Sequence, residues 1–232
     1  MIEVRPFATL GTFRNQWLDA KHHFLFGSYR DTARQGFGRL LVWNDDKVAA
    51  GSGFDPHLHK EMEIVTYVRT GAITHKDSLG NEGRTEAGDV QVMHAGTGIT
   101  HAEYNEESDD TTLFQIWILP DRAAAAPGWA ARQFPRGEGL AVLASGRPQD
   151  RGGEALNLNA DAAVIAGTLK RGETATLKLG PGRAAYLVPA IGALTVNGVV
   201  ANTRDGVPVV DERELTITAT EDAEVVLVDV AA

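Results

Sequence analysis

Residues 51–68 read GSGFDPHLHKEMEIVTYV, a glycine-rich start followed by two histidines and a β-rich run. The run Glu63–Val68 is one of several short segments of this kind, which turn residues separate from about Arg39 to the C-terminus. The others include Arg39–Trp43, Val90–Met93, Leu113–Leu119, Ala185–Val188, Leu215–Ala219 and Val225–Val230. Asn197-Gly198 is the strongest hairpin signal, because both residues tolerate a positive φ. This pattern predicts an all-β protein built as a sandwich or a barrel.

The strand pattern is interrupted between Pro120 and Pro135, where three prolines flank and follow an alanine run. Proline-rich segments of this kind connect domains more often than they form part of one. We therefore predict an N-terminal domain over residues 1–120, an inter-domain linker over 121–135 and a C-terminal domain over 136–232. A short helical turn is expected around Trp129–Gln133.

Length, charge and composition exclude several classes of protein. With 232 residues and 43% hydrophobic content, the chain can bury a real core. It has no apolar run long enough to span a bilayer, and its start lacks a secretory signal, so we expect a cytoplasmic protein without membrane contact. The net charge of -9, without a Lys/Arg cluster, disfavours direct nucleic-acid binding. Because there is no cysteine, any metal would be held by His, Asp or Glu.

Histidine spacing predicts a metal site in the first domain. All seven histidines precede residue 102. His57 and His59 share one face of a strand, with Cα atoms about 6.6 Å apart, so both rings can reach one ion. The pair His101-Ala-Glu103 repeats this spacing later in the chain. An antiparallel neighbour strand would bring this second pair opposite the first.

The spacing argument leaves two points open. An isolated His-x-His is often a solvated surface pair, although two such pairs in an all-β chain favour a metal. Glu63 follows His59 by four residues, so parity allows it as a ligand as readily as Glu103. Three imidazoles and one carboxylate suit Fe, Mn, Ni, Co, Cu or Zn and disfavour Mg or Ca. Four protein ligands would leave one or two positions for substrate or dioxygen.

Two motifs in the first domain resemble the pirin family of the cupin superfamily. They are His57-x-His59-(x)3-Glu63-(x)2-Thr66-Tyr67 and Met93-x-Ala95-Gly-Thr-Gly-Ile-x-His101-x-Glu103-Tyr104-Asn105. The general cupin motifs are only partly kept, since a glycine is displaced to Gly71 and His94 stands where cupins usually have proline. The resemblance covers nearly the whole chain and is strongest from residue 51 to 119. It implies a bicupin of two antiparallel β-barrel (jelly-roll) domains, of which the C-terminal one has lost its metal site.

The resemblance also implies a site and an activity. The implied ligands are His57, His59, His101 and Glu103, with Glu63 as a buried supporting carboxylate. The implied cofactor is one divalent ion, with Fe(II) as the leading choice and Zn, Ni, Mn, Co or Cu as alternatives. Quercetin 2,3-dioxygenase activity is attributed to bacterial and human members. We therefore expect a dioxygenase that cleaves flavonols or related enolic aromatics with dioxygen, in which Glu103 acts as the catalytic proton acceptor.

Two rival functions remain at this stage. One is a metal- and redox-sensing regulatory protein that binds a transcription factor or a metabolic enzyme without catalysis. The other is a bicupin that only stores or carries a metal. For His75 and His94 we favour packing roles over the alternative that they donate to a metal-bound imidazole, which needs a partner for its other nitrogen. Trp117 is expected to be a core residue.

Overall fold

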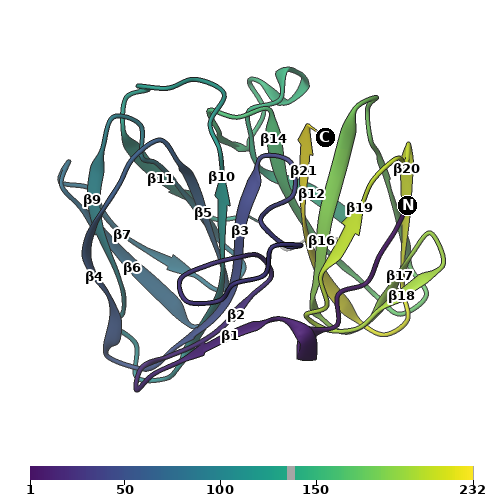
Figure 1. Cartoon of the computed structure of the whole chain (residues 1–232), viewed down its shortest axis with the longest axis horizontal. Coiled ribbons are helices and arrows are strands. Elements are labelled where there is room, and N and C mark those ends of the chain that lie inside the picture. Colours follow the sequence, from purple (N-terminus) through teal and green to yellow (C-terminus); the bar gives the residue numbers. More distant parts are fainter. Residues whose placement is uncertain (135–138, 232) are drawn as a thin grey trace.

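The computed structural model describes residues 1–134 and 139–231 and shows two β lobes side by side (Figure 1). The all-β class predicted from the sequence is confirmed. Pro135, the last residue of the predicted linker, and the first residues of the predicted second domain lie outside the described part. The domain limits therefore stay a prediction. Within the described ranges, no helix is long and apolar enough to cross a membrane.

The first lobe consists of two antiparallel sheets. Its strands are β1 (Gly11–Arg14), β2 (Leu18–His22), β3 (Leu40–Val48), β4 (Ser52–His59), β5 (Glu63–Thr70), β6 (Ala72–Asp77), β7 (Glu82–Glu86), β8 (Val90–His94), β9 (Ile99–Asn105), β10 (Thr111–Ile118) and β11 (Gly128–Arg132), after the 3-10 turn η1 (Phe7–Thr9). The larger sheet has the order β1-β2-β3-β10-β5-β8-β11, and the smaller one has the order β4-β9-β6-β7. Side chains from the two sheets meet between them, where the candidate site lies.

The second lobe also has two sheets, which are antiparallel except for the parallel pair of β12 and β13. Its strands are β12 (Gly139–Ser145), β13 (Leu156–Asn157), β14 (Ala162–Leu169), β15 (Thr174–Lys178), β16 (Arg183–Ile191), β17 (Leu194–Val196), β18 (Val199–Ala201), β19 (Val207–Val209), β20 (Glu214–Ala219) and β21 (Ala223–Ala231), with the 3-10 turn η2 (Pro148–Asp150). The sheets have the orders β13-β12-β14-β21-β16-β19 and β15-β20-β17-β18. Asn197 and Gly198 join β17 to β18 at positive φ, as predicted. The bicupin architecture is thus confirmed, each lobe being a two-sheet jelly-roll rather than a closed barrel.

The helical turn predicted around Trp129–Gln133 is wrong. Residues Gly128–Arg132 form β11 and pair with β8, with Trp129 opposite Met93. Alanine is the best helix former, but helix propensity is a weak preference that tertiary contacts override, and the edge of β8 offers a row of backbone partners. Strand pairing therefore decides the conformation of this segment.

An apolar core continues from one lobe into the other. Trp43 and Phe114 of the first lobe pack in one cluster with Tyr186 of the second, and all three side chains are fully buried. The N-terminal segment crosses to the second lobe, where Arg5 pairs with Gly206, and Figure 1 accordingly places the N-terminus beside β19 and β20. A Cβ at position 206 would lie 2.1 Å from the Tyr186 hydroxyl, so only glycine fits this crossing.

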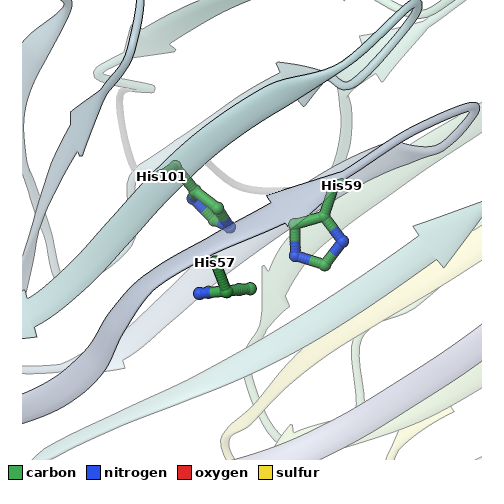
Figure 2. Close-up of side chains that lie close together, drawn as sticks. All are labelled: His57, His59 and His101. Carbon is green, nitrogen blue, oxygen red and sulfur yellow. The ribbon is translucent and has the colours of Figure 1, made fainter.

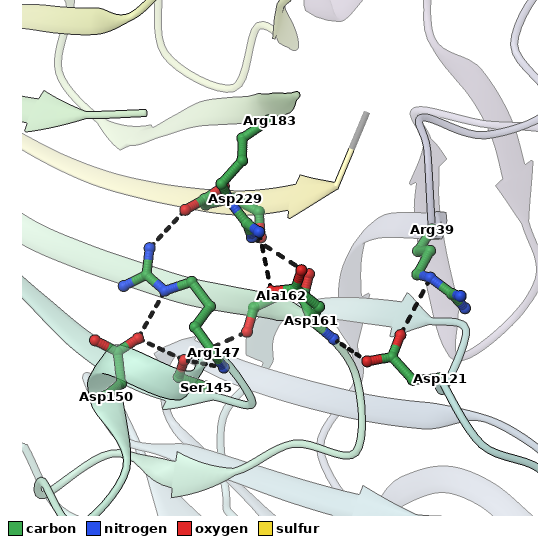
Figure 3. A network of polar contacts seen from close by, with 9 residues as sticks. All are labelled: Arg39, Asp121, Ser145, Arg147, Asp150, Asp161, Ala162, Arg183 and Asp229. Atoms are coloured by element: carbon green, nitrogen blue, oxygen red, sulfur yellow. Dashed lines mark hydrogen bonds and ion pairs between the residues drawn. The ribbon is translucent and has the colours of Figure 1, made fainter. Parts of the chain in front are cut away.

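Buried ion pairs stabilise the second lobe (Figure 3). Asp229 is 1% exposed and accepts hydrogen bonds from Arg147 Nη1 at 2.5 Å and from Arg183 Nε at 2.6 Å. The network continues toward the first lobe, because Asp121 accepts the backbone N–H of Asp161 at 2.7 Å. Asp121 also pairs with Arg39, which immediately precedes β3.

Replacing Asp229 with alanine is expected to lower the free energy of unfolding by about 3 kcal/mol, because two largely buried guanidinium groups would lose a partner. Urea denaturation measures this change. The matched control is Asp222→Ala, which removes an exposed partner of Lys170 and should leave the free energy of unfolding nearly unchanged. Equal losses in the two variants would contradict a stabilising role of the buried network.

A buried histidine between the lobes should make stability depend on pH. His23 is fully buried with Nδ1 2.9 Å from the Tyr186 hydroxyl, and burial lowers its pKa from 6.5 to about 3. The unfolded chain therefore binds a proton below pH 6.5 that the folded chain does not bind until about pH 3. Between pH 7 and pH 5 this single group should reduce the free energy of unfolding by about 2 kcal/mol.

Urea denaturation of the wild type and of His23→Gln at both pH values tests this expectation. The wild type should lose about 2 kcal/mol more than the variant, because glutamine does not titrate. Equal losses of stability in the two proteins would show that His23 titrates similarly in the folded and unfolded states.

Candidate metal centre

Three histidines converge at the centre of the first lobe (Figure 2). His57 and His59 come from β4 and His101 from β9, and the strand register places His57 directly opposite His101. One ring nitrogen from each lies within 4.8 Å of the other two. The prediction that an antiparallel neighbour brings the second pair opposite the first is thus confirmed for His101, whereas Glu103 lies opposite Phe54.

A local irregularity in β4 precedes His57. The register between β4 and β9 shifts between Phe54 and His57, at a segment that contains Pro56. Proline has no N–H to donate, so a regular ladder is not continued through it. His57 Nδ1 lies 2.7 Å from the carbonyl oxygen of Asp55 and donates to it, which directs Nε2 as an acceptor toward the cluster.

The environment of the cluster keeps imidazoles uncharged. Burial, followed by the neighbouring His101 and His57 rings, lowers the pKa of His59 to about 4. Burial, followed by His57 and His75, lowers the pKa of His101 to about 3. At neutral pH both rings therefore carry the lone pairs that a metal ion needs.

A buried chain of polar groups orients His101. His75 Nε2 lies 3.0 Å from Asp77 Oδ2, and His75 Nδ1 lies 3.4 Å from His101 Nδ1. When His75 donates its Nε2 proton to Asp77, its Nδ1 accepts from His101, and His101 Nε2 is left with a free lone pair. That atom is buried and has no hydrogen-bond partner among the described residues. An unpaired, oriented imidazole nitrogen fits a metal ligand.

His75 and Trp129 contact the cluster from outside it. We favoured a packing role for His75, whereas the structure agrees with the alternative, because His75 supports His101 and stacks on the Trp129 ring at a centroid distance of 4.9 Å. Trp129 belongs to β11, in the segment predicted as a linker. The only sequence signal was a histidine two residues before an aspartate on one strand.

Glu103 lies in the same pocket as the histidines but outside their nitrogen cluster. Its side chain is 3% exposed. Oε1 accepts from Thr66 Oγ1 at 3.0 Å and from Gln91 Nε2 at 2.6 Å, while Oε2 accepts from Gln115 Nε2 at 2.8 Å. The structure thus groups three of the four predicted ligands and holds the fourth beside them in a fixed orientation.

The partners of Glu103 belong to a row of polar side chains across the larger sheet. Strand register aligns His22 with Asn44, Asn44 with Gln115, Gln115 with Thr66, and Thr66 with Gln91. All five are buried. Buried polar groups of this kind need partners, and here several of them hold one carboxylate. In the sequence, each of these residues is visible only as a single polar residue inside an otherwise apolar strand. That they form a row follows only from the way the strands pair.

Glu63, the alternative ligand that spacing allowed, is not near the cluster. The chain turns between β4 and β5, where Glu61 has a φ of 50°, so counting parity from His59 does not reach across the turn. Glu63 lies in the larger sheet, 1% exposed, with Oε2 2.5 Å from His94 Nδ1 and accepting the backbone N–H of Asn159 at 2.9 Å. It is a structural carboxylate between the lobes.

The pocket that contains the cluster has a volume of about 580 Å³ and mainly apolar walls. Its aromatic lining residues are Phe13, Trp17, Phe26, Phe54 and Trp117. Trp117, which we expected to be a core residue, contacts His59 edge-on at a centroid distance of 4.9 Å. Such a pocket suits a flat, largely apolar ligand with a few polar groups.

Similar proteins are named as pirins or as quercetin 2,3-dioxygenases. The Pirin-like protein of Caulobacter vibrioides is 55% identical over 234 residues, with both chains fully covered. The quercetin 2,3-dioxygenase of Escherichia coli K12 is 39% identical over 230 residues, which cover 99% of this chain and 98% of that one. The crystal structure of the bacterial pirin YhhW from Escherichia coli in complex with nickel(II) matches with a TM-score of 0.94 and 38% identity, covering 100% of this chain and 99% of that one.

The two jelly-roll lobes and the histidine cluster define a bicupin in which the described residues form a candidate metal centre in the first lobe. The Pirin family model matches residues 3–118, and the model described as the quercetinase C-terminal cupin domain matches residues 142–230. The chain belongs to the pirin family.

Proposed function

We propose that this chain is a metal-dependent dioxygenase that cleaves flavonols such as quercetin, or related enolic aromatics. The observation that carries the proposal is the convergence of three imidazole nitrogens on one side of an aromatic-lined pocket. The names of the relatives support the same reaction class. The proposed substrates are a small aromatic molecule and dioxygen.

We further propose His57, His59, His101 and Glu103 as the ligands of one divalent ion, with Fe(II) as the working metal. A bound ion of this kind supplies a Lewis acid for a substrate hydroxyl and, if redox-active, a path for electrons to dioxygen. The donor set supports a borderline metal over Mg or Ca, because imidazoles provide three of the four ligands.

Glu103 is the proposed proton acceptor for the substrate hydroxyl. Oε1 already accepts two hydrogen bonds, whereas Oε2 accepts one from Gln115 and keeps a free lone pair. This one lone pair can hold the ion or take the proton but not both, so Glu103 would leave the ion when it accepts the proton, while the three donors keep the carboxylate oriented. The aromatic walls orient a flat ring and exclude water from the site.

Oxygen consumption with quercetin tests the function. Protein loaded anaerobically with Fe(II) is compared with metal-free protein and with Zn(II)-loaded protein, since Zn(II) binds similar ligands but has no redox chemistry. We expect turnover only with Fe(II). One bound Fe(II) per chain without oxygen consumption would overturn the proposal and favour a sensing role.

A further inference from the structure

Asp46 is a buried acid in the pocket to which the proposed reaction gives no role. It lies on β3, is 2% exposed and lines the same pocket as the three histidines. Its Oδ1 atom is buried without a hydrogen-bond partner in the described part of the chain. Unpaired buried carboxyl oxygens are rare, because leaving water without a new partner is costly. A ligand that reaches this carboxyl group from the pocket would supply the missing partner.

Strand β10 gives the order of groups along the pocket. Its side chains point alternately to opposite faces. One face therefore carries, in spatial order, Trp117, Gln115 and Leu113. Trp117 contacts His59, and Gln115 donates to Glu103. His59 and Glu103 therefore lie beside successive pocket-facing residues of β10, namely Trp117 and Gln115. We call the position beside each such residue a level of the pocket.

Asp46 lies at the next level. It pairs with Leu113 of β10, while Asn44, two residues earlier on β3, pairs with Gln115. Two residues of a strand span about 6.6 Å, so Asp46 lies about that far along β3 from Asn44, the register partner of the Gln115 that holds Glu103. The direction is away from His59.

The surroundings of Asp46 are apolar. Ala20 is its register partner on β2, and Leu18, Trp17 and Phe54 line the same pocket and pack in one cluster with Ala20. Burial, followed by the charges of Asp45 and Glu103, raises the pKa of Asp46 well above its usual range. A neutral carboxylic acid both donates and accepts a hydrogen bond, whereas the carboxylate of Glu103 only accepts.

We propose that Asp46 hydrogen-bonds a substrate hydroxyl at the end of the pocket beyond Glu103, and so selects polyhydroxylated flat aromatics. This inference rests on the proposed function, because it assumes that the substrate's enolic oxygen binds at the histidine cluster. A flat molecule with one oxygen at the cluster and a second hydroxyl on a remote ring makes both contacts. A molecule without the remote hydroxyl leaves Asp46 unpaired.

Binding of two flavonols tests the role of Asp46 without requiring turnover. Quercetin carries remote ring hydroxyls, whereas 3-hydroxyflavone keeps the enolic hydroxyl and lacks them. Dissociation constants are measured on Zn(II)-loaded protein by quenching of tryptophan fluorescence. In the wild type we expect quercetin to bind about 10-fold more tightly, the size of one hydrogen bond to a buried polar group.

Asp46→Leu should remove this preference by weakening quercetin alone, with 3-hydroxyflavone changed by less than about 2-fold. Asp46→Asn should keep the preference, because an amide also donates and accepts. Zinc content should stay at one ion per chain in both variants. Asp46→Leu should also raise the melting temperature, since it removes an unpaired buried acid. If leucine prevents folding, Asp46→Ala provides the same comparison.

Three results would overturn the inference. Equal weakening of both flavonols in Asp46→Leu would indicate a change of pocket shape instead of a lost hydrogen bond. An unchanged preference for quercetin would show that Asp46 does not contact the ligand. Failure of the wild type to bind either flavonol would overturn the proposed function together with this inference, and so differs from the first two results.

Discussion

His101→Ala is expected to lose its bound metal and, with it, all oxygen consumption with quercetin. The structure directs His101 Nε2 toward His57 and His59, and no residue of the described ranges hydrogen-bonds to it. His75, which orients this atom, does not belong to the group of three nitrogens found among the described residues. Removing a supporting group typically lowers metal affinity by about 10 to 100-fold, so losing a ligand should lower it by at least about 100-fold.

Metal content after dialysis against a weak chelator, together with oxygen uptake, measures this loss. The matched control is His94→Gln, which removes an imidazole outside the cluster and retains a donor toward Glu63. The control should keep one ion per chain. Full metal occupancy in His101→Ala would contradict the assignment of this residue as a ligand.

Glu103→Gln is expected to lower turnover by about 100-fold or more, the lower end of what a positioned proton acceptor contributes. Glutamine cannot accept a proton in this role. Its amide would also place a donor against the donors of Gln91 or Gln115, because both already point at the carboxylate. The three histidines stay in place in this variant, so metal binding should weaken less than in His101→Ala.

Single-turnover measurements on the metal-loaded variant separate these two effects. Glu63→Gln is the control, because it alters a second buried carboxylate that lies in the larger sheet and contacts His94. It should affect stability and leave turnover per bound metal within about 2-fold. Wild-type turnover by metal-loaded Glu103→Gln would refute the role of Glu103 as proton acceptor.

Asp46 and Glu103 lie at different positions along one pocket. Asp46 is proposed to select the ligand, and Glu103 is proposed to accept a proton. Glu103 has donors on both oxygens, whereas Asp46 Oδ1 has none in the described residues. The two acids should therefore respond differently to substitution. Changes at Glu103 should appear mainly in turnover, and changes at Asp46 should appear mainly in the affinity for hydroxylated ligands.

The sequence by itself determined what depends on local pattern. Turn residues between short β-rich runs were sufficient for the all-β class and for the Asn197-Gly198 hairpin, because both follow from backbone preferences of neighbouring residues. The spacing of His57 and His59 was sufficient to place both rings on one face of a strand. The resemblance to pirins added the bicupin and the fourth proposed ligand.

Only the tertiary structure decided what depends on strand pairing. Counting alternate residues from His59 could not choose between Glu63 and Glu103 as the ligand, because the chain turns at Glu61 and enters a different sheet. Nor could it show that His75 supports His101, since those two residues meet only when β6 pairs with β9. The polar row and the unpaired acid at Asp46 follow from the same cause: register aligns residues that are distant in sequence, and no local pattern encodes which strands become neighbours.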